Sequence, residues 1–254
     1  MAFRASAFLA YSKPGKCLAP TRHNMRTVIA ANGEMEDHPR LRDLWRGADL
    51  RIAADGGAVN ARAHLALPPH ILIGDLDSLD ESTRGWCEQA HTEMIQHPRA
   101  KDQTDLELAL DLAIARGATE ITILGALGGR FDQTLANVLL LAKPTFARIT
   151  ARIAGADFNA WIAWECASVR GRIGDTVSLI PLTERVEDIV TEGLLYPLRN
   201  ETLYFGAARG VSNELVAEQA EIAFTRGLLL VVHLFKAADN ERQAAVRRRR
   251  SYRV

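Results

Sequence analysis

The sequence predicts an α/β N-terminal domain with a doubly wound, mostly parallel sheet, followed by a smaller all-β sandwich domain. From Met25 to about residue 150, short apolar runs alternate with helical intervals, which is the pattern of strands joined by crossover helices. After about Ile153 the helical periodicity disappears, and short β-rich runs separated by glycine and proline turns replace it. We therefore expect the domain boundary between Thr150 and Ala160.

The individual elements follow from these runs. In the first domain, strands are predicted at 28–31, 50–54, 71–73, 92–96 and 121–125. Helices are predicted there at 40–47, 58–67, 81–90, 106–117 and 135–142. In the helix at 106–117, apolar residues recur at i, i+3, i+4, i+7 and i+8, which gives it one continuous apolar face. In the second domain, strands are predicted at 161–165, 176–182, 203–205, 220–225 and 228–235.

Both ends of the chain differ from the two domains. A strand-like run follows Met25 at once, so the compact protein is expected to begin there, with residues 1–24 as a disordered extension. The α/β domain is expected to cover 25–155 and the β-sandwich domain 156–238. Residues 239–254 then form a basic tail, because four consecutive arginines lie within it.

The composition is that of an ordinary globular protein. Of 254 residues, 48% are hydrophobic and 24% are charged, and the formal net charge is zero, which gives no support to a nucleic-acid partner. No run of 18 apolar residues occurs, so no membrane segment is expected. The three widely spaced cysteines are typical of neither a disulfide framework nor a zinc site, and we expect a cytoplasmic protein.

Acidic side chains follow the predicted strand at 71–73. That strand runs into Gly74-Asp75-Leu76-Asp77-Ser78, so it delivers Asp75 and Asp77 to the carboxyl edge of the sheet, where open α/β sheets bind ligands. Two such carboxylates repel each other unless a cation lies between them. Because no His or Cys accompanies them, Mg²⁺ suits this site better than zinc does.

A second acidic cluster, Lys101-Asp102-Gln103-Thr104-Asp105, opens the helix at 106–117. Asp102 and Asp105 are three residues apart, which is also the spacing of a capping box that stabilises a helix start. Capping and catalysis are compatible, so both interpretations stay open. Lys101 is unfavourable beside the positive end of a helix, and it makes better sense if it faces a phosphate.

Two glycine-containing turns between a strand and a helix are candidate anion sites. Asp55-Gly56-Gly57 can offer helix N–H groups to an anion, but taken alone the motif slightly favours a tight turn with Asp55 as the helix cap. In Gly128-Gly129-Arg130-Phe131-Asp132-Gln133, two glycines, a guanidinium and a helix start can form a phosphate cradle. The sequence contains no Walker-type nucleotide motif.

Together with motifs of the second domain, these motifs resemble the thiamine pyrophosphokinase (thiamine diphosphokinase) family. Seven blocks match in chain order and span about 190 residues. They are Ala54-Asp55-Gly56-Gly57-Ala58, Gly74-Asp75-Leu76-Asp77-Ser78, Lys101-Asp102-Gln103-Thr104-Asp105, Gly128-Gly129-Arg130-Phe131-Asp132-Gln133, Gly174-Asp175 with Val177-Ser178-Leu179-Ile180-Pro181-Leu182, Thr191-Glu192-Gly193-Leu194-Leu195-Tyr196-Pro197-Leu198 and Gly210-Val211-Ser212-Asn213-Glu214.

The resemblance implies an enzyme that transfers a diphosphate group from ATP to the hydroxyethyl group of thiamine, giving AMP and thiamine diphosphate. It implies that the α/β domain binds ATP and Mg²⁺, and that the β-sandwich domain binds thiamine and mediates dimerisation. The thiamine sites would then lie between the two subunits of a homodimer.

The same resemblance implies roles for individual residues. The catalytic residues would be Asp75, Asp77, Asp102 and Asp105, of which Asp75, Asp77 and Asp105 would hold Mg²⁺. The ATP contacts would be Asp55, Gly56, Gly57, Lys101, Thr104, Gly129, Arg130, Asp132 and Gln133. The thiamine contacts would be Asp102, Tyr196, Ser212 and Asn213. Tyr196 stands where many relatives have tryptophan.

Two alternatives are weighed against this function. One is a pyrophosphokinase of the same fold that acts on another alcohol, such as a pterin, and the motifs of the second domain argue against it. The other is a non-catalytic sensor of a nucleotide or of thiamine, in which the acidic side chains bind without turnover. The presence of every acid at 75–77 and 102–105 argues against the sensor.

Overall fold

The computed structural model describes residues 25–236, so the expectations for residues 1–24 and for the basic tail lie outside the described residues. The first part of the chain contains, in order, β1 (Arg26–Ala30), α1 (Pro39–Arg46), β2 (Leu50–Ala54), α2 (Gly57–Asn60), the π-helix η1 (Ala61–Leu65), β3 (Ile71–Gly74), α3 (Glu81–Gln89), β4 (Glu93–Gln96), α4 (Asp105–Ala115), β5 (Glu120–Leu124), α5 (Phe131–Leu140), the 3-10 helix η2 (Pro144–Arg148) and β6 (Thr150–Ala154). Each strand and helix predicted for this part is present, with ends that differ by a few residues.

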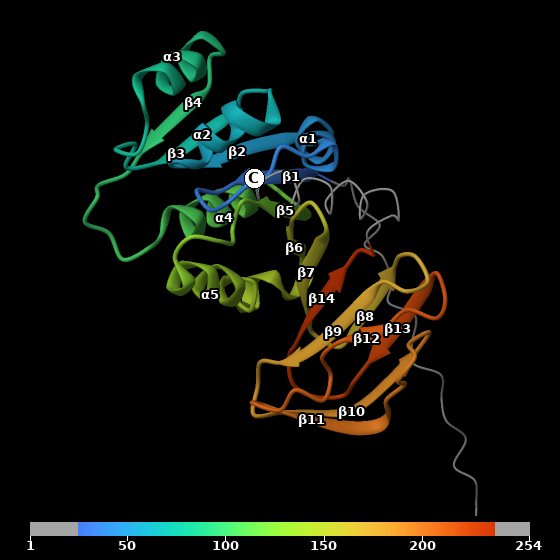
Figure 1. Cartoon of the computed structure of the whole chain (residues 1–254). Coiled ribbons are helices and arrows are strands. Elements are labelled where there is room, and N and C mark those ends of the chain that lie inside the picture. The colour runs from blue at the N-terminus through green and yellow to red at the C-terminus, as the bar shows by residue number, and fades with distance from the viewer. Residues whose placement is uncertain (1–24, 237–254) are drawn as a thin grey trace, which may run out of the picture.

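Six parallel strands form one half of a ten-stranded sheet, in the order β4-β3-β2-β1-β5-β6 (Figure 1). The chain starts at β1, builds outward through β2, β3 and β4, and then returns to the other side of β1 with β5. The strand order therefore reverses beside β1. In open α/β sheets such a reversal opens a crevice at the carboxyl ends of the strands, and ligands bind there.

Helices cover both faces of this parallel half. On one face, α4 packs Leu106 and Leu110 into a core that also contains Ile123 of β5. On the other face, Leu41 and Trp45 of α1 lie in a second core with residues of β1 and β5. Because apolar residues lie on both sides of each central strand, these strands are apolar along their whole length rather than alternating.

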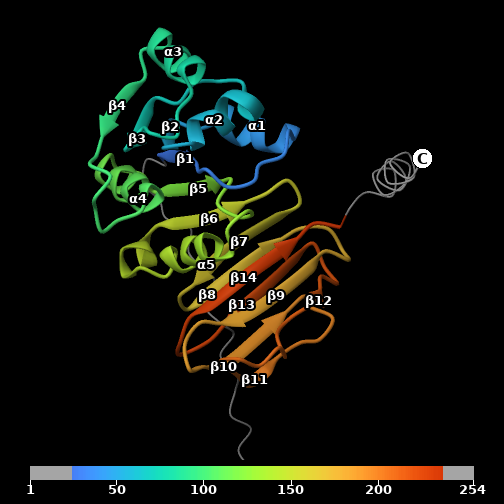
Figure 2. The same ribbon diagram turned by 60° about the vertical axis from the view of Figure 1, so that its left-hand side comes forward.

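The second part of the chain is antiparallel. Its strands are β7 (Phe158–Ala163), β8 (Cys166–Arg170), β9 (Thr176–Pro181), β10 (Arg185–Glu192), β11 (Arg199–Tyr204), β12 (Asn213–Glu214), β13 (Gln219–Ala223) and β14 (Leu229–Leu234). β7 pairs with β6, so the large sheet continues through β7-β14-β9-β12, and a separate sheet has the order β11-β10-β13-β8 (Figure 2). Apolar residues of both sheets share one core. The predicted fold class is confirmed.

Two features of the second part were not predicted. The first is that one sheet runs from the parallel into the antiparallel part, which the pairing of β6 with β7 brings about. The second is that β8, β10 and the short β12 were missed, as was β6 in the first part of the chain. In β10 the register shifts between Val186 and Ile189, and Asp188 between them has a φ of +56°. Such a bulge breaks the two-residue alternation by which a half-buried strand is found in a sequence.

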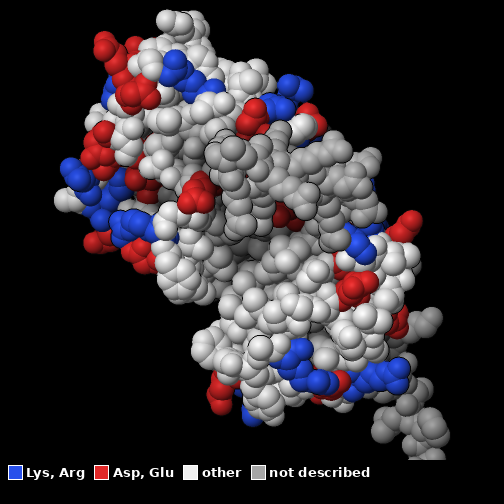
Figure 3. Space-filling view, viewed as in Figure 1, with Lys and Arg blue, Asp and Glu red and all other residues white. Residues whose placement is uncertain are grey.

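Charged side chains of both signs are interspersed on the face shown in Figure 3, as the net charge of zero suggests. The described residues of that face therefore form no broad basic area of the kind that binds a polyanion. Among the helices of residues 25–236, none has the length and apolar character needed to cross a membrane.

A buried aspartate–histidine contact links the start of β9 to β14 in the antiparallel part. Asp175 precedes β9, His233 lies on β14, and His233 Nε2 is 2.8 Å from Asp175 Oδ2. The backbone N–H groups of Arg172 and Lys236 also donate to the Asp175 carboxylate, at 2.9 and 2.8 Å. Burial alone would raise the pKa of Asp175, but the N–H donors of Lys236 and Arg172, together with His233, outweigh burial and lower the pKa below its ordinary value.

Asp175→Asn should therefore lower the free energy of unfolding at pH 7 by about 1–3 kcal/mol, because one amide oxygen cannot accept all three donors. Since the folded-state pKa is lowered, the advantage of the wild type is complete above the unfolded pKa of about 4 and is lost as pH falls through the folded pKa. Urea unfolding at several pH values measures this difference. The exposed Asp157→Asn is the control, and a difference that grows toward acid pH would contradict the role of Asp175.

Candidate active site

The crevice beside β1 contains a cavity of about 610 Å³. Loops that follow β1, β2 and β5 surround it, and the start of α4 closes one side. Its lining residues are Ala31, Asn32, Gly33, Glu34, Ala54, Asp55, Thr104, Asp105, Leu106, Ala126, Gly128, Gly129, Arg130, Gln133 and Asn137. Of the predicted ATP contacts, Asp55, Thr104, Gly129, Arg130 and Gln133 therefore lie together at one edge of the sheet.

Three carboxylates gather at the end of this cavity. Asp55, Asp75 and Asp77 each offer an oxygen, and these oxygens lie within 4.8 Å of one another. Asp55 comes from the loop after β2, whereas Asp75 and Asp77 come from the loop after β3. Gly74 makes the approach possible, because a Cβ atom there would lie 2.9 Å from Asp55 Cβ and 3.1 Å from Asp105 Oδ1.

The donor set fits a divalent cation. Asp55 is buried, and its Oδ1 has no hydrogen-bond partner in the described structure. A buried carboxylate oxygen without a partner is costly unless a cation binds it. The Asp77 N–H donates to Asp75 Oδ1 at 3.3 Å and lowers the pKa of Asp75, with Lys101 and Arg99 acting in the same direction. Oxygen ligands alone are the set that Mg²⁺ prefers.

Asp105 lies beside this trio but is already paired. Lys101 Nζ is 2.7 Å from Asp105 Oδ1, and both side chains are largely buried. The expected capping by Asp102 and Asp105 was wrong, because Thr104 is the N-cap and its Oγ1 accepts the Glu107 N–H at 3.2 Å. Thr104 and Glu107 have the same spacing as the pair that was predicted, so the side-chain cap lies two residues further along the chain. Asp102 itself is exposed.

The glycine-rich loop after β5 is held against the loop after β1. The N–H groups of Gly33 and Glu34 donate to the carbonyls of Gly125 and Leu127, at 2.7 and 2.8 Å. The Glu34 side chain crosses Gly128, where any Cβ would collide with it, and its Oε1 accepts the Gly129 N–H at 2.9 Å. The amide that was expected to bind phosphate therefore holds a carboxylate of the chain itself.

Some predicted ATP contacts do not line this cavity. Gly56 and Gly57 are buried against the end of β1, where a Cβ would collide with Asn32 or with the Ala30 carbonyl. Their visible role is close packing of α2 on the sheet. Asp132 is exposed and pairs with Arg130, whose Nε lies 3.1 Å from Asp132 Oδ1.

Two predicted thiamine contacts line a second, separate cavity of about 350 Å³ in the antiparallel part. Tyr196 and Asn213 line it, together with Leu179, Leu195, Pro197, Leu198, Arg209, Gly210 and Val211. Asn213 is buried, accepts the Tyr196 N–H at 3.0 Å and donates to the Tyr196 carbonyl at 2.7 Å. Ser212 is not among the lining residues, and its N–H donates to Ser178 Oγ at 3.0 Å. The Tyr196 side chain is 67% exposed.

Several residues that shape the first cavity were missed. Asn60 Nδ2 donates to the carbonyls of Ala31 and Gly33, both at 2.8 Å, and fixes the loop after β1. Asn137 Nδ2 donates to the Ala126 carbonyl at 2.7 Å and fixes the loop after β5. The Asn32-Gly33 dipeptide at the end of the first strand was a turn signal that could have placed this loop at the site.

The sequence matches two family models. The model described as "Thiamin pyrophosphokinase, catalytic domain" matches residues 41–153, and "Thiamin pyrophosphokinase, vitamin B1 binding domain" matches residues 168–229. Thiamine pyrophosphokinase of Bacillus subtilis (strain 168) is 30% identical over 211 residues, which are 82% of this chain and 98% of the relative. Thiamine pyrophosphokinase 1 of Oryza sativa subsp. japonica is 26% identical over 216 residues, covering 75% and 81% of the two chains.

Solved structures give the same result. The crystal structure of thiamine pyrophosphokinase from Bacillus subtilis superposes with a TM-score of 0.74 at 28% identity, covering 84% of this chain and 100% of that chain. The crystal structure of thiamin pyrophosphokinase from Geobacillus thermodenitrificans has a TM-score of 0.72 at 27% identity. This match covers 84% of this chain and 99% of that chain. Both parts of the fold are thus shared with these structures.

Asp55→Asn tests the acidic trio. Without a metal ion the variant should be more stable than the wild type, by on the order of 1 kcal/mol, because a charge that two neighbours repel is gone. Asparagine also tolerates the left-handed φ of +44° at this position. The variant should lose most of the rise in melting temperature that Mg²⁺ gives the wild type. Differential scanning calorimetry with and without Mg²⁺ measures both effects, and an unchanged rise would remove Asp55 from the metal site.

Proposed function

The chain belongs to the thiamine pyrophosphokinase family, and from that premise we propose how its residues convert ATP and thiamine into AMP and thiamine diphosphate. The observation that carries the proposal is that Asp55 both lines the large cavity and belongs to the acidic trio. A cavity with a cationic, glycine-rich wall therefore opens directly onto a cluster of carboxylates. That is the arrangement that a metal-bound polyphosphate needs.

The glycine-rich loop and the start of α5 bind the phosphates of ATP. Gly129 and Arg130 lie where β5 passes into α5, and both line one wall of the cavity, so a backbone N–H group and a guanidinium are available there to bind phosphate. Thr104 and Gln133 line the same cavity and supply further hydrogen bonds to the nucleotide. A phosphate at Gly129 would replace the Glu34 carboxylate as the acceptor of its N–H.

Asp55, Asp75 and Asp77 hold the metal ion, with Asp105 beside them. The family resemblance implied Asp75, Asp77 and Asp105 as the metal ligands. We assign Asp55 in place of Asp105, because Asp55 has a buried oxygen without a partner in the described structure, whereas Asp105 pairs with Lys101. A bound Mg²⁺ supplies positive charge that neutralises the transferred phosphates and orients them. Lys101, which now pairs with Asp105, reaches the same region and can turn to a phosphate oxygen.

Thiamine is a flat cation that needs an aromatic wall and an acidic one. Tyr196 supplies the aromatic face, and Asn213 fixes its backbone through two hydrogen bonds. Asp102 lies at the opening of α4 and orients the thiamine hydroxyethyl group toward the phosphates. The cavity at the acidic trio and the cavity at Tyr196 share no lining residue. Among the described residues of one chain, the aromatic wall and the acidic wall therefore lie in different cavities.

We therefore propose a homodimer in which Tyr196 of one chain closes the site of the other. Two exposed apolar areas suit burial between subunits. Phe131, Leu135 and Leu139 form an exposed row at i, i+4 and i+8 on α5, and Tyr196 and Phe205 are each 67% exposed in the antiparallel part.

The match to a vitamin B1 binding model at 168–229 disfavours the pterin alternative, because that region of the chain would select the alcohol. A sensor without turnover is disfavoured by the family to which the chain belongs.

The direct test incubates the protein with thiamine, ATP and Mg²⁺. AMP and thiamine diphosphate should appear in equal amounts, whereas ADP with thiamine monophosphate would contradict transfer in one step. Asp77→Asn should lower kcat by about a hundredfold or more, because removal of a carboxylate ligand costs several kcal/mol of transition-state stabilisation. Asp157→Asn serves as a surface control. A rate near that of the wild type at saturating Mg²⁺ would remove Asp77 from the metal site.

Subunit complementation tests the shared site. Asp77→Asn and Tyr196→Ala chains carrying different affinity tags are co-expressed, and the heterodimer is isolated. One of its two sites then combines an intact Asp77 with an intact Tyr196 from the other chain, so about half the wild-type rate per dimer should return at low thiamine concentration. Each variant alone should be slow under the same conditions. No recovery in the heterodimer, or a fully active monomer, would refute the shared site.

A further inference from the structure

The spacing of the acidic trio depends on two separate segments of chain. Asp55 precedes α2 and η1, whereas Asp75 and Asp77 precede α3. Carboxylates that repel each other at 4.8 Å will separate unless the segments that carry them are held together. The apolar contacts of α3 come from Trp86 and Cys87, in the second half of the helix. The first turn of α3, which follows the acidic loop, is held to η1 by polar contacts instead.

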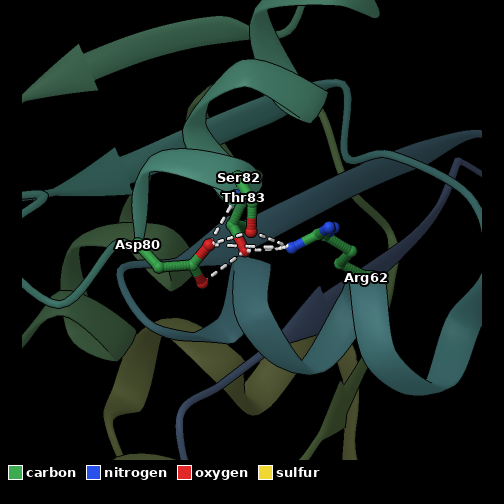
Figure 4. A network of polar contacts seen from close by, with 4 residues as sticks. All are labelled: Arg62, Asp80, Ser82 and Thr83. Atoms are coloured by element: carbon green, nitrogen blue, oxygen red, sulfur yellow. Dashed lines mark hydrogen bonds and ion pairs between the residues drawn. The ribbon is translucent and has the colours of Figure 1, made fainter.

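That contact is the network in Figure 4, in which Arg62 of η1 reaches the start of α3. Arg62 Nη1 contacts Ser82 Oγ and lies 3.4 Å from Thr83 Oγ1 and 3.6 Å from Asp80 Oδ1. Asp80 is the N-cap of α3, where its carboxylate accepts the Thr83 N–H at 2.8 Å and the Thr83 hydroxyl at 2.7 Å. One carboxylate thus ends the acidic loop, starts α3 and binds the guanidinium of η1.

The loop between Asp75 and Asp80 is fixed to the same helix at a second point. Leu76, between the two acids, is buried and has a left-handed φ of +63°. Its carbonyl accepts a hydrogen bond from Arg84 Nη2 of α3 at 3.3 Å. Because the loop is short and held at both ends, a shift of α3 must move Asp75 and Asp77 with it.

Two further observations support a structural role for the contact between Arg62 and Asp80. η1 is a π-helix, a form that is rare and is often found at functional sites, and Arg62 lies within it. The hydroxyl of Ser82, followed by the hydroxyl and N–H of Thr83, lowers the pKa of Asp80 well below its ordinary value. Asp80 therefore stays ionised throughout the pH range in which the protein would be assayed.

We propose that Arg62 and Asp80 are a positioning pair that sets the distance between Asp55 and the Asp75–Asp77 loop, and thereby the affinity of the trio for a divalent cation. Neither residue contacts the cation or the substrates. This inference rests on the proposed function, because the trio is assigned there to the metal ion. Loss of the pair should relax the trio apart and weaken metal binding while thiamine binding stays the same.

The experiment measures Mn²⁺ binding to the nucleotide-free full chain by isothermal titration calorimetry. Arg62→Gln and Asp80→Asn should each weaken Mn²⁺ binding by about tenfold or more, as residues that support metal ligands do. Asparagine remains a good N-cap, so Asp80→Asn removes the charge without removing the start of α3. Arg62→Lys should restore most of the affinity, and the double variant should be little worse than either single variant.

The matched control is Arg26→Gln. Arg26 is also half-exposed and also pairs with an aspartate, Asp49, but it lies at the amino end of β1, away from the site. It should leave Mn²⁺ affinity unchanged. If Arg62→Gln lowers the melting temperature but leaves Mn²⁺ affinity unchanged, the pair is merely structural and the proposal is overturned.

Asp55→Asn separates failure of this inference from failure of the proposed function. If Asp55→Asn abolishes Mn²⁺ binding and Arg62→Gln does not affect it, the assignment of the metal site is supported and the positioning role of Arg62 and Asp80 is refuted. If Mn²⁺ binds Asp55→Asn as tightly as the wild type, the metal assignment is wrong and this inference falls with it. In the supporting outcome, the KM for thiamine of Arg62→Gln equals that of the wild type while the Mg²⁺ concentration for half-maximal rate rises.

Discussion

Repulsion among Asp55, Asp75 and Asp77 is the constraint on which the rest of the site depends. Carboxylate oxygens within 4.8 Å of one another repel by about 1–3 kcal/mol for each pair, according to how far water screens them. Arg99 pairs with Asp77 at 3.3 Å, but Asp55 Oδ1 has no partner in the described structure, and the backbone contributes much of what holds the three side chains together. Asp55 and Leu76 adopt left-handed conformations, and Gly74 between the two loops leaves room for both. Such strain is retained only where the surrounding structure fixes it, and it is found most often at functional sites.

The strand order explains why this constraint arises at one edge. β2 and β3 are neighbours in the parallel sheet, so the loops after them meet, and β1 and β5 bring the glycine-rich loop to the same edge. Sequence could predict that Asp75 and Asp77 end a buried strand, because an apolar run leads into them. It could not predict that Asp55 joins them, since the pairing of β2 with β3 depends on packing across the sheet. The family resemblance implied Asp105 instead, which lies nearby but pairs with Lys101.

In other parts of the chain, the sequence-based prediction was correct where a single local property determined the structure. The apolar face of α4 was evident because a single periodicity of the helix sets it, and four of its residues are buried as expected. It failed where two rules competed. Asp102 and Asp105 had capping spacing, but so did Thr104 and Glu107, and the hydroxyl cap prevailed. In β10 the bulge at Asp188 concealed the strand, and the continuous sheet was missed because only tertiary structure joins β6 to β7.

Several charged groups around the cavity are paired with other groups of the chain. Lys101 pairs with Asp105, Arg130 pairs with Asp132, and the Gly129 amide binds Glu34. A free nucleotide would have to displace these carboxylates and leave them without a partner, which costs free energy where they are partly buried. A metal–nucleotide complex carries charges of both signs. Its phosphates can pair with the lysine and arginine side chains while its metal ion attracts the carboxylates. On the proposed function, this internal pairing favours the metal-bound form of ATP over either component alone, with no residue dedicated to that choice.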